Sequence, residues 1–380
     1  MGNTHGKISL PSNLGLSMVC FLLLSIAPQI LAEVDHTESS WKGRSDRTIP
    51  QPKNDLVGKK AEAGFEELHT LGTVYWATGK YEQAIPLLER AAEKRPDSDK
   101  TLYFLGYCYD VLGQYEKAIE AYEQAVRINP HLSRAQKNLA IAYSNIERTE
   151  DAIRAYKKLI RISPDDHEVY YNQGAFYASI ELHKDAIKSY KKALLINPDS
   201  ADTYFKMGFS YGKLGLLTDA TKAYKQAIRI KPDFADAHFN LGFTCNKLGL
   251  TEEEIEAYSQ GIRINPNDTL AYFQLGVAYG NLGRFEKEIA AYKQAIEIDP
   301  DFAAAYHNLG LAYANVQLYD KAVEAFKEVT RIRPHDTAVH YPLGIAYLLA
   351  GNETAALEQY KILQSLDSDV ADRLYGLIYK

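Results

Sequence analysis

Histidine and cysteine, two residue types that often carry out catalysis, have a spacing in this sequence that does not favour it. Ten histidines and three cysteines occur among 380 residues, but they form no H-E-x-x-H, C-x-x-C or C-x-x-C-H motif. The sequence also lacks a phosphate-binding P-loop. So few cysteines exclude a disulfide scaffold and a zinc site built from cysteine. The sequence therefore predicts a protein that is not an enzyme and has no metal or cofactor.

The side chains best suited to bind a ligand recur at an interval of 34 residues. We predict that two such columns contact a partner: Asn138, Asn172, Lys206, Asn240, Gln274 and Asn308 in one, and Lys213, Lys247, Asn281 and Asn315 in the other. An amide offers both a donor and an acceptor, so a ladder of amides could hold an extended peptide backbone. The lysines could fix a carboxylate, or they could simply form a solvated face.

The same interval extends over most of the chain. Prolines recur every 34 residues at Pro96, Pro130, Pro164, Pro198, Pro232, Pro266, Pro300 and Pro334. If each proline is position 32 of a unit, position 8 is glycine or alanine, position 11 is tyrosine in eight of nine units, and position 24 is aromatic in eight. Apolar residues at positions 4, 7 and 11 share one face of a helix with the small residue at position 8. This pattern predicts a helix in the first half of each unit.

A second helix is predicted in the second half of each unit. Glycine is frequent at position 15, where it suits the left-handed end of the first helix, and the proline at position 32 ends the second helix. The acidic or amide residue that usually follows the proline suits the start of the next helix. Glu254 and Glu288 interrupt a column of small residues at position 20, with Gly261 nearby. We therefore expect looser packing around units six and seven.

These columns resemble those of the tetratricopeptide repeat (TPR) family over about four-fifths of the chain. The resemblance implies an all-α fold, a right-handed α-solenoid of about nine 34-residue helix pairs with a C-terminal capping helix. The repeats would occupy residues 61–370, as units 65–98, 99–132, 133–166, 167–200, 201–234, 235–268, 269–302, 303–336 and 337–370. The capping helix would occupy residues 371–380.

The resemblance also implies a function. A TPR solenoid would be a non-enzymatic scaffold that binds a protein or an extended peptide in a concave groove lined by the first helices. The asparagine column resembles the asparagine ladder in the repeat region of O-GlcNAc transferases, here without their catalytic domain. The alternative is that asparagine is merely common at this position in the family. A second reading of the function is a non-catalytic subunit of an envelope enzyme or of a secretion or assembly complex.

Two further features bear on the groove. The carboxylate clamp of the family is not reproduced, because Lys137 is followed by Ile141 where the clamp needs asparagine. Aromatic residues at position 5, such as Tyr103, Phe205 and Phe273, could anchor a partner or could pack between neighbouring helices.

The N-terminal region is predicted to lie outside the solenoid. Residues 14–31 are almost continuously apolar and Ala32 is small, so residues 1–32 are predicted to be a signal peptide or an N-terminal membrane anchor. Residues 33–60 are polar and aperiodic, as in a flexible linker. We expect a protein exported to the periplasm or the extracellular space, or tethered to the membrane through residues 14–31. The net charge of −6 argues against nucleic acid as a partner.

Overall fold

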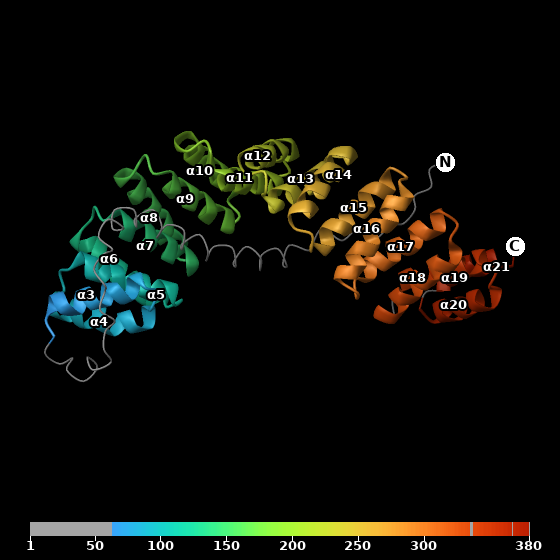
Figure 1. The fold of residues 1–380 in the computed structure, drawn as a ribbon, viewed down its shortest axis with the longest axis horizontal. Coiled ribbons are helices and arrows are strands. Elements are labelled where there is room, and N and C mark those ends of the chain that lie inside the picture. Colours follow the sequence, from blue (N-terminus) through green and yellow to red (C-terminus); the bar gives the residue numbers. More distant parts are fainter. Residues whose placement is uncertain (1–62, 335–336, 367, 380) are drawn as a thin grey trace, which may run out of the picture. The chain divides into compact units, whose positions relative to one another are not determined.

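The computed structural model describes residues 63–334, 337–366 and 368–379. Within these ranges the chain forms 19 helices, labelled α3 to α21 in chain order, and no strand (Figure 1). The predicted signal peptide or anchor at residues 1–32 and the predicted linker at residues 33–60 lie outside the described residues. None of the described helices combines the length and the apolar composition needed to cross a membrane.

The helices form nine pairs followed by a single helix. The first helices of the pairs are α3 (Phe65–Ala77), α5 (Asp99–Val111), α7 (Ser133–Asn145), α9 (His167–Ser179), α11 (Ala201–Lys213), α13 (Ala235–Leu248), α15 (Thr269–Asn281), α17 (Ala303–Asn315) and α19 (Thr337–Leu349). The second helices are α4 (Tyr81–Lys94), α6 (Tyr115–Ile128), α8 (Thr149–Ile162), α10 (His183–Ile196), α12 (Leu217–Ile230), α14 (Thr251–Ile264), α16 (Phe285–Ile298), α18 (Tyr319–Ile332) and α20 (Glu353–Leu366). The last helix is α21 (Ser368–Ile378).

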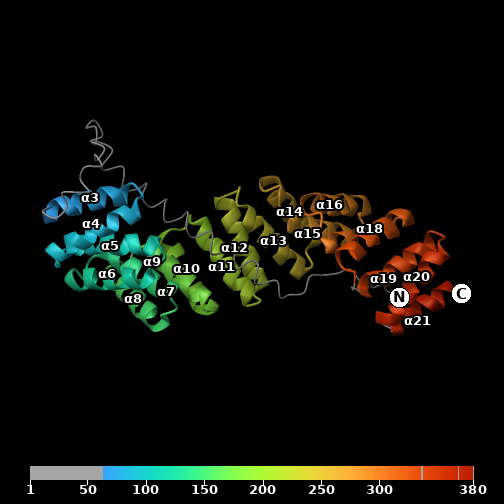
Figure 2. The same ribbon diagram turned by 90° about the horizontal axis from the view of Figure 1, so that it is seen from below.

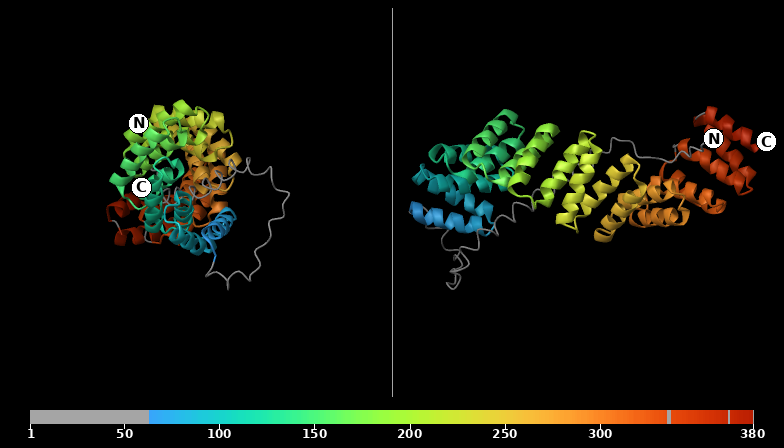
Figure 3. Two further views of the ribbon diagram at one scale, coloured as in Figure 1. Left: turned by 90° about the vertical axis from the view of Figure 1, so that its left-hand side faces the viewer. Right: turned by 90° about the horizontal axis from the view of Figure 1, so that it is seen from above.

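Each helix packs mainly on the helices before and after it in the chain, as the successive pairs in Figures 2 and 3 show. Several first helices also touch the first helix of the next pair, for example α3 with α5 and α7 with α9. No two successive second helices of the described part come as close. The first helices therefore lie on the inner side of neighbouring pairs. This arrangement confirms the predicted all-α solenoid of nine helix pairs.

In most pairs, a glycine of the first helix faces an aromatic ring of the second helix. A Cβ atom on Gly106 would lie 2.7 Å from the ring of Tyr122, and a Cβ on Gly174 would lie 2.6 Å from the ring of Tyr190. Both rings are fully buried. Because the ring occupies the space that a side chain would need, glycine at position 8 lets the two helices of a pair approach closely.

The turns explain the helix ends. Position 15 has a positive φ in every pair, and glycine occupies it in six pairs, with φ between 66° and 77°. The backbone N–H that follows this residue donates to the carbonyl of position 11, for example from Gln114 to Tyr109 at 2.8 Å, as in a Schellman motif. At the helix start, the capping side chain comes from position 34 in four pairs: Ser98, Asp166, Ser200 and Asp268. The cap is thus one residue later than the sequence suggested.

The expectation of looser packing around units six and seven is wrong. Glu254 and Glu288 are buried, yet α14 and α16 approach their neighbours as closely as the other helices do. The helix that stands apart is α8, which is farther from α7 than usual and touches α9 least of all. Ala140 replaces the usual glycine against Tyr156 in α8, and Phe176 fills a place in α9 that is small in most pairs. Larger side chains hold helix axes farther apart.

The final helix covers the end of the stack, as predicted. Leu374 of α21 is fully buried and lies where a side chain on Gly344 would go, with its Cδ2 at 2.5 Å from the Cβ position. The outer surface of α21 is not purely polar, because Tyr375, Leu377 and Tyr379 are exposed. The helix begins at Ser368, three residues before the predicted start.

Candidate functional site

The predicted partner-binding residues lie on the surface of the first helices. Side chains at positions 7, 8 and 10 of these helices are buried in almost every pair, whereas positions 9 and 13 of α11 and α13 are at least partly exposed. We call the surface formed by positions 6, 9, 12 and 13 the first-helix face. Because the first helices of neighbouring pairs touch, these positions form continuous columns across several pairs.

Two amides of the predicted ladder are engaged inside the protein. The Nδ2 of Asn138 donates to the Tyr122 hydroxyl at 3.2 Å, and the Nδ2 of Asn308 donates to the Tyr292 hydroxyl at 3.4 Å. Each bond joins one pair to the next. The side chain of Asn308 is 0% exposed, and its Oδ1 has no hydrogen-bond partner. Asn308 therefore has no surface to offer a partner in this conformation.

Three members of the ladder remain partly exposed, namely Asn172, Asn240 and Gln274. The Nδ2 of Asn240 donates to the Asp236 carbonyl at 2.8 Å in its own helix, which leaves its Oδ1 as an acceptor. The structure thus divides the predicted amide column into two internal bridges and three accessible groups. Binding by these groups stays a prediction.

The lysines of the two columns differ in environment. Lys206 is partly buried, and desolvation lowers the pKa of its ammonium, although the nearby Asp202 and Asp236 oppose that shift. Lys213 and Lys247 are exposed and form no ion pair with the described residues. The second column continues with Asn281, which is exposed, and Asn315, which is partly buried.

Each of the two exposed lysines lies over a phenylalanine. The Nζ of Lys213 is 5.3 Å from the centre of the Phe209 ring, and the Nζ of Lys247 is 5.4 Å from that of Phe243. The Phe243 side chain is 53% exposed. These phenylalanines are not among the residues predicted from the sequence to contact a partner. The available signal was an aromatic residue four places before a lysine in two consecutive units, because residues i and i+4 share a helix face.

The aromatic residues at position 5 pack within the solenoid. The Phe205, Phe273 and Tyr171 rings contact the buried ring at position 24 of the same pair, with centroids 5.8 to 6.1 Å apart. Phe205 and Phe273 also contact Phe234 and Phe302 at the start of the next pair. These contacts favour the packing alternative. At the same position, Lys137 forms an ion pair with Glu168 at 2.6 Å.

One pentapeptide matches a nucleophile motif. Gly208, Ser210 and Gly212 fit G-x-S-x-G, but the segment lies inside α11, where a nucleophile elbow needs a strand-to-helix turn. Ser210 is fully buried, and its Oγ has no hydrogen-bond partner. The match of these residues to the nucleophile motif is therefore coincidental.

Other possible chemistry has little support in the described residues. Burial raises the pKa of the Cys108 thiol to about 12 and that of Cys245 to about 11, so both stay protonated. The described residues contain no cluster of side chains suited to a metal ion.

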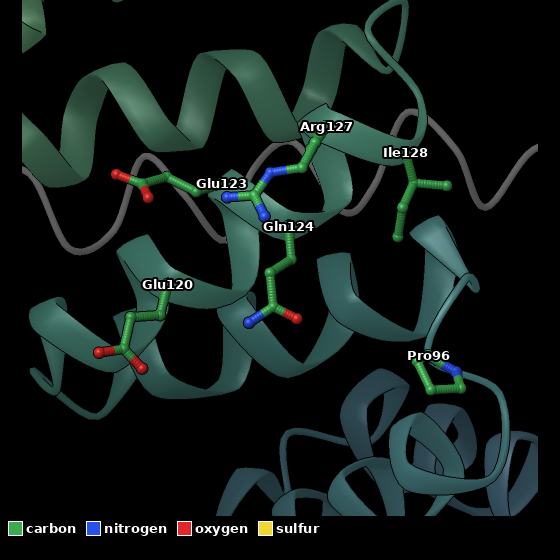
Figure 4. Close-up of a pocket in the computed structure, with 6 residues that line it drawn as sticks. All are labelled: Pro96, Glu120, Glu123, Gln124, Arg127 and Ile128. Carbon is green, nitrogen blue, oxygen red and sulfur yellow. The ribbon is translucent and has the colours of Figure 1, made fainter.

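A hollow of about 430 Å³ lies beside α6, on the side of the second helices (Figure 4). It is lined by Pro96, Glu120, Glu123, Gln124, Arg127 and Ile128. The carboxylate of Glu123 accepts a hydrogen bond from the Tyr143 hydroxyl and so joins two pairs. The hollow holds no convergent set of groups that would define a ligand.

Comparisons with known proteins agree with this architecture. Family models described as tetratricopeptide repeat or TPR repeat match residues 69–133, 112–173, 183–215, 213–249, 235–268, 257–290, 281–317 and 303–336. No curated protein matches the chain.

Several solved structures are similar to parts of the chain. A MamA protein is 30% identical over 45% of this chain and 93% of its own, with a TM-score of 0.44. YrrB, described as a TPR protein with an unusual peptide-binding site, is 26% identical over 49% of this chain and 95% of its own, with a TM-score of 0.46. MamA from Desulfovibrio magneticus RS-1 is 19% identical over 44% of this chain and 96% of its own, with a TM-score of 0.42. On the repeat matches, which together cover more than half of its length, the chain belongs to the tetratricopeptide repeat family.

Proposed function

We propose that this protein is a non-enzymatic scaffold that binds a peptide or protein partner, in extended conformation, on its first-helix face. The observation that carries the proposal is the repeated pairing of Lys213 with Phe209 and of Lys247 with Phe243. The Phe243 ring is exposed and the Phe209 ring is partly exposed. An aromatic ring beside a cation without an ion pair offers both apolar contact and charge. Because the arrangement repeats in two consecutive pairs, it gives the partner two points of contact.

The amides would supply the contacts to the partner's backbone. Asn172, Asn240 and Gln274 lie on the same face and stay partly exposed. Amide side chains can donate to carbonyls and accept from N–H groups, so they suit a main chain of any sequence. Asn138 and Asn308 would act indirectly, by joining neighbouring pairs through Tyr122 and Tyr292.

The proposal includes export or membrane tethering. It rests on the apolar character of residues 14–31, which suits a signal peptide or an anchor. Fractionation of cells that express the full chain would test it. Recovery of the protein in the cytosol alone, with residues 1–32 intact, would contradict it.

A pull-down from a native envelope extract tests the binding surface. The bait is the full chain, compared with a variant that carries Lys213→Ala, Phe243→Ala and Lys247→Ala. A matched control carries Lys158→Ala, Lys192→Ala and Leu195→Ala, which remove two lysines and an apolar side chain exposed on second helices. Circular dichroism must show that all three fold.

We expect partners identified by mass spectrometry to be lost only from the first-helix variant. A second variant, with Asn172→Ala, Asn240→Ala and Gln274→Ala, tests the amides without disturbing the two internal bridges. Retention of the same partners by both variants would exclude the first-helix face as the binding surface.

A further inference from the structure

A cluster of aromatic side chains lies on the first helices of the first two pairs, on the same side of α5 as the carboxylate of Asp110. Trp76 of α3 contacts Phe104 and Tyr107 of α5, with ring centroids 4.6 and 5.6 Å apart. Tyr103 contacts Phe104 at 5.3 Å and Tyr107 at 6.5 Å. Asp110 follows Tyr107 by three residues and Tyr103 by seven, so it lies on the same face of α5. We call these five residues the aromatic–carboxylate patch.

The Asp110 carboxylate lacks a cationic partner among the described residues. It forms none of the ion pairs there, and its hydrogen bond from the Tyr122 hydroxyl is long, at 3.5 Å. Burial raises the pKa of Asp110 to about 6, and the bond from Tyr122 opposes the shift only in part. All five side chains are nevertheless partly exposed.

The patch is connected to the predicted ladder. The Tyr122 hydroxyl that donates to Asp110 accepts a hydrogen bond from Asn138. The carboxylate, the tyrosine and the first amide of the ladder thus form one chain of contacts that runs from α5 through α6 to α7. Asp110 is therefore linked, through the buried Tyr122 ring, to the internal bridge made by Asn138.

The chemistry of the patch selects a cation with a planar face. A half-buried carboxylate without a counter-ion is costly, and a partner that brings a positive charge removes that cost. Faces of Trp and Tyr rings attract cations and stack preferentially on guanidinium. Arginine therefore fits better than lysine, because it can pair with the carboxylate and stack on the rings.

We propose that the aromatic–carboxylate patch binds an arginine side chain of the partner. The inference rests on the proposed function, because it assigns a subsite of the same face. Together with Lys213 and Lys247, the patch fixes the direction in which the partner binds. An arginine of the partner lies at the first two pairs, and an acidic residue of the partner lies at the fifth and sixth pairs.

Trp76 provides a direct reporter for the test. The chain has two tryptophans, so Trp41→Phe in the full-length protein leaves Trp76 as the only source of tryptophan emission. The probe is the peptide acetyl-Ala-Ala-Arg-Ala-Ala-amide. Its controls carry citrulline, the neutral isostere of arginine, or glutamate in place of arginine. We expect a saturable change in Trp76 emission with the arginine peptide and much weaker responses to the controls.

The variant Asp110→Asn isolates the charge. Asparagine can still accept the hydrogen bond from Tyr122, so the fold should persist, and Glu93→Gln on the exposed side of α4 is the matched control. We expect Asp110→Asn to weaken binding of the arginine peptide at least about tenfold, whereas Glu93→Gln leaves it unchanged. Lowering the pH from about 7.5 to about 5 should weaken binding to the parent protein by about tenfold, because only about a tenth of Asp110 would then be ionised.

Three results would overturn the inference: equal binding of the citrulline peptide, unchanged affinity in Asp110→Asn, or no saturable response. The peptide titration does not depend on the envelope pull-down. A failure of the patch is therefore distinguishable from a failure of the proposed function.

Discussion

Glu254 is the single residue whose ionisation should most affect stability. Its side chain is 1% exposed and stands where most pairs carry alanine. Its Oε1 accepts a hydrogen bond from Asn246 at 3.0 Å, but burial raises the pKa of the carboxyl to about 7. The folded protein therefore holds a proton that the unfolded chain loses at a pH near 4.5.

The variant Glu254→Gln should change how stability depends on pH. A raised carboxyl pKa in the folded state makes the free energy of unfolding fall as pH rises from about 4.5 to about 7, and then level off. Gln keeps the bond to Asn246 but cannot ionise. We expect the variant to be more stable than the parent by about 1–2 kcal/mol at pH ~8, and by little at pH ~4.

Urea titrations at the two pH values would measure this difference. Glu256→Gln, an exposed change on the same helix, is the control and should leave the pH dependence as it is. An equal effect of Glu254→Gln at both pH values would show that its carboxyl ionises normally in the folded protein.

The sequence was sufficient to identify the columns of predicted binding residues. It was not sufficient to predict which residue in a column bonds inside the protein and which stays exposed. Asn138, Asn172, Asn240 and Asn308 occupy equivalent positions, and a tyrosine precedes each of them by 16 residues. Only Asn138 and Asn308 bond to that tyrosine, whereas Asn240 turns back to its own helix. The choice depends on side-chain rotamers and on local helix spacing, which a column of identical residues does not reveal.

At the scale of elements, the end of the first helix follows one rule in all nine pairs. Position 15 is left-handed even where it is not glycine: Glu147, Glu181 and Gln317 have φ of 59°, 60° and 62°. A residue with a Cβ pays about 1 kcal/mol or more for this conformation. Glu147→Gly, Glu181→Gly and Gln317→Gly should therefore each raise the stability of their pair, by about 0.5–1 kcal/mol. Thermal unfolding of each variant and of the parent protein would test this. The melting temperature should rise in the three glycine variants and fall in Gly215→Ala.

Gly261 of α14 leaves space for the Phe239 ring, at position 5 of α13. A Cβ at this position would lie 2.3 Å from Cε1 of Phe239. We expect Gly261→Ala to destabilise the protein by about 1–3 kcal/mol, because the ring must move in a packed interface. Gly212→Ala is the matched control, because nothing lies within 4 Å of its Cβ position. In a helix that change should stabilise by up to about 1 kcal/mol. Shifts of the denaturation midpoint in the same direction for both variants, relative to the parent protein, would contradict this account.

The elements themselves were largely predictable, because the signals that define them are local. Phased prolines mark the ends of the second helices, and position 15 marks the ends of the first helices. The looser packing expected at Glu254 and Glu288 is absent, because their side chains are accommodated without wider spacing of the helices. Glu254 also accepts a hydrogen bond from Asn246 on the adjacent helix. The wider spacing of α8 arises from the sizes of residues on three helices together. No single column of the repeat shows it.

For the whole molecule, the junction between α8 and α9 should be the weakest link of the stack. In a solenoid each pair contacts only its neighbours, so stability depends on every interface in turn. Elsewhere the second helix of one pair lies close along the first helix of the next, but α8 and α9 meet mainly through large side chains. The Tyr156 and Phe176 rings stack at 5.8 Å, and Leu159 of α8 and Val169 of α9 are also buried.

A junction that depends on few large contacts should fail when one of them is removed. Phe176→Ala should cost about 3–5 kcal/mol and leave α8 and α9 without a close backbone approach to replace the lost contact. We expect urea unfolding to separate into two transitions, and amide exchange to become fast on both sides of the junction while α12 to α18 stay protected. Leu241→Ala, a buried change in the closely packed α13, should cost about 2–5 kcal/mol and keep one transition, because its helices still touch along their length. A single transition with a lower midpoint in Phe176→Ala would mean that coupling passes this junction as it passes the others.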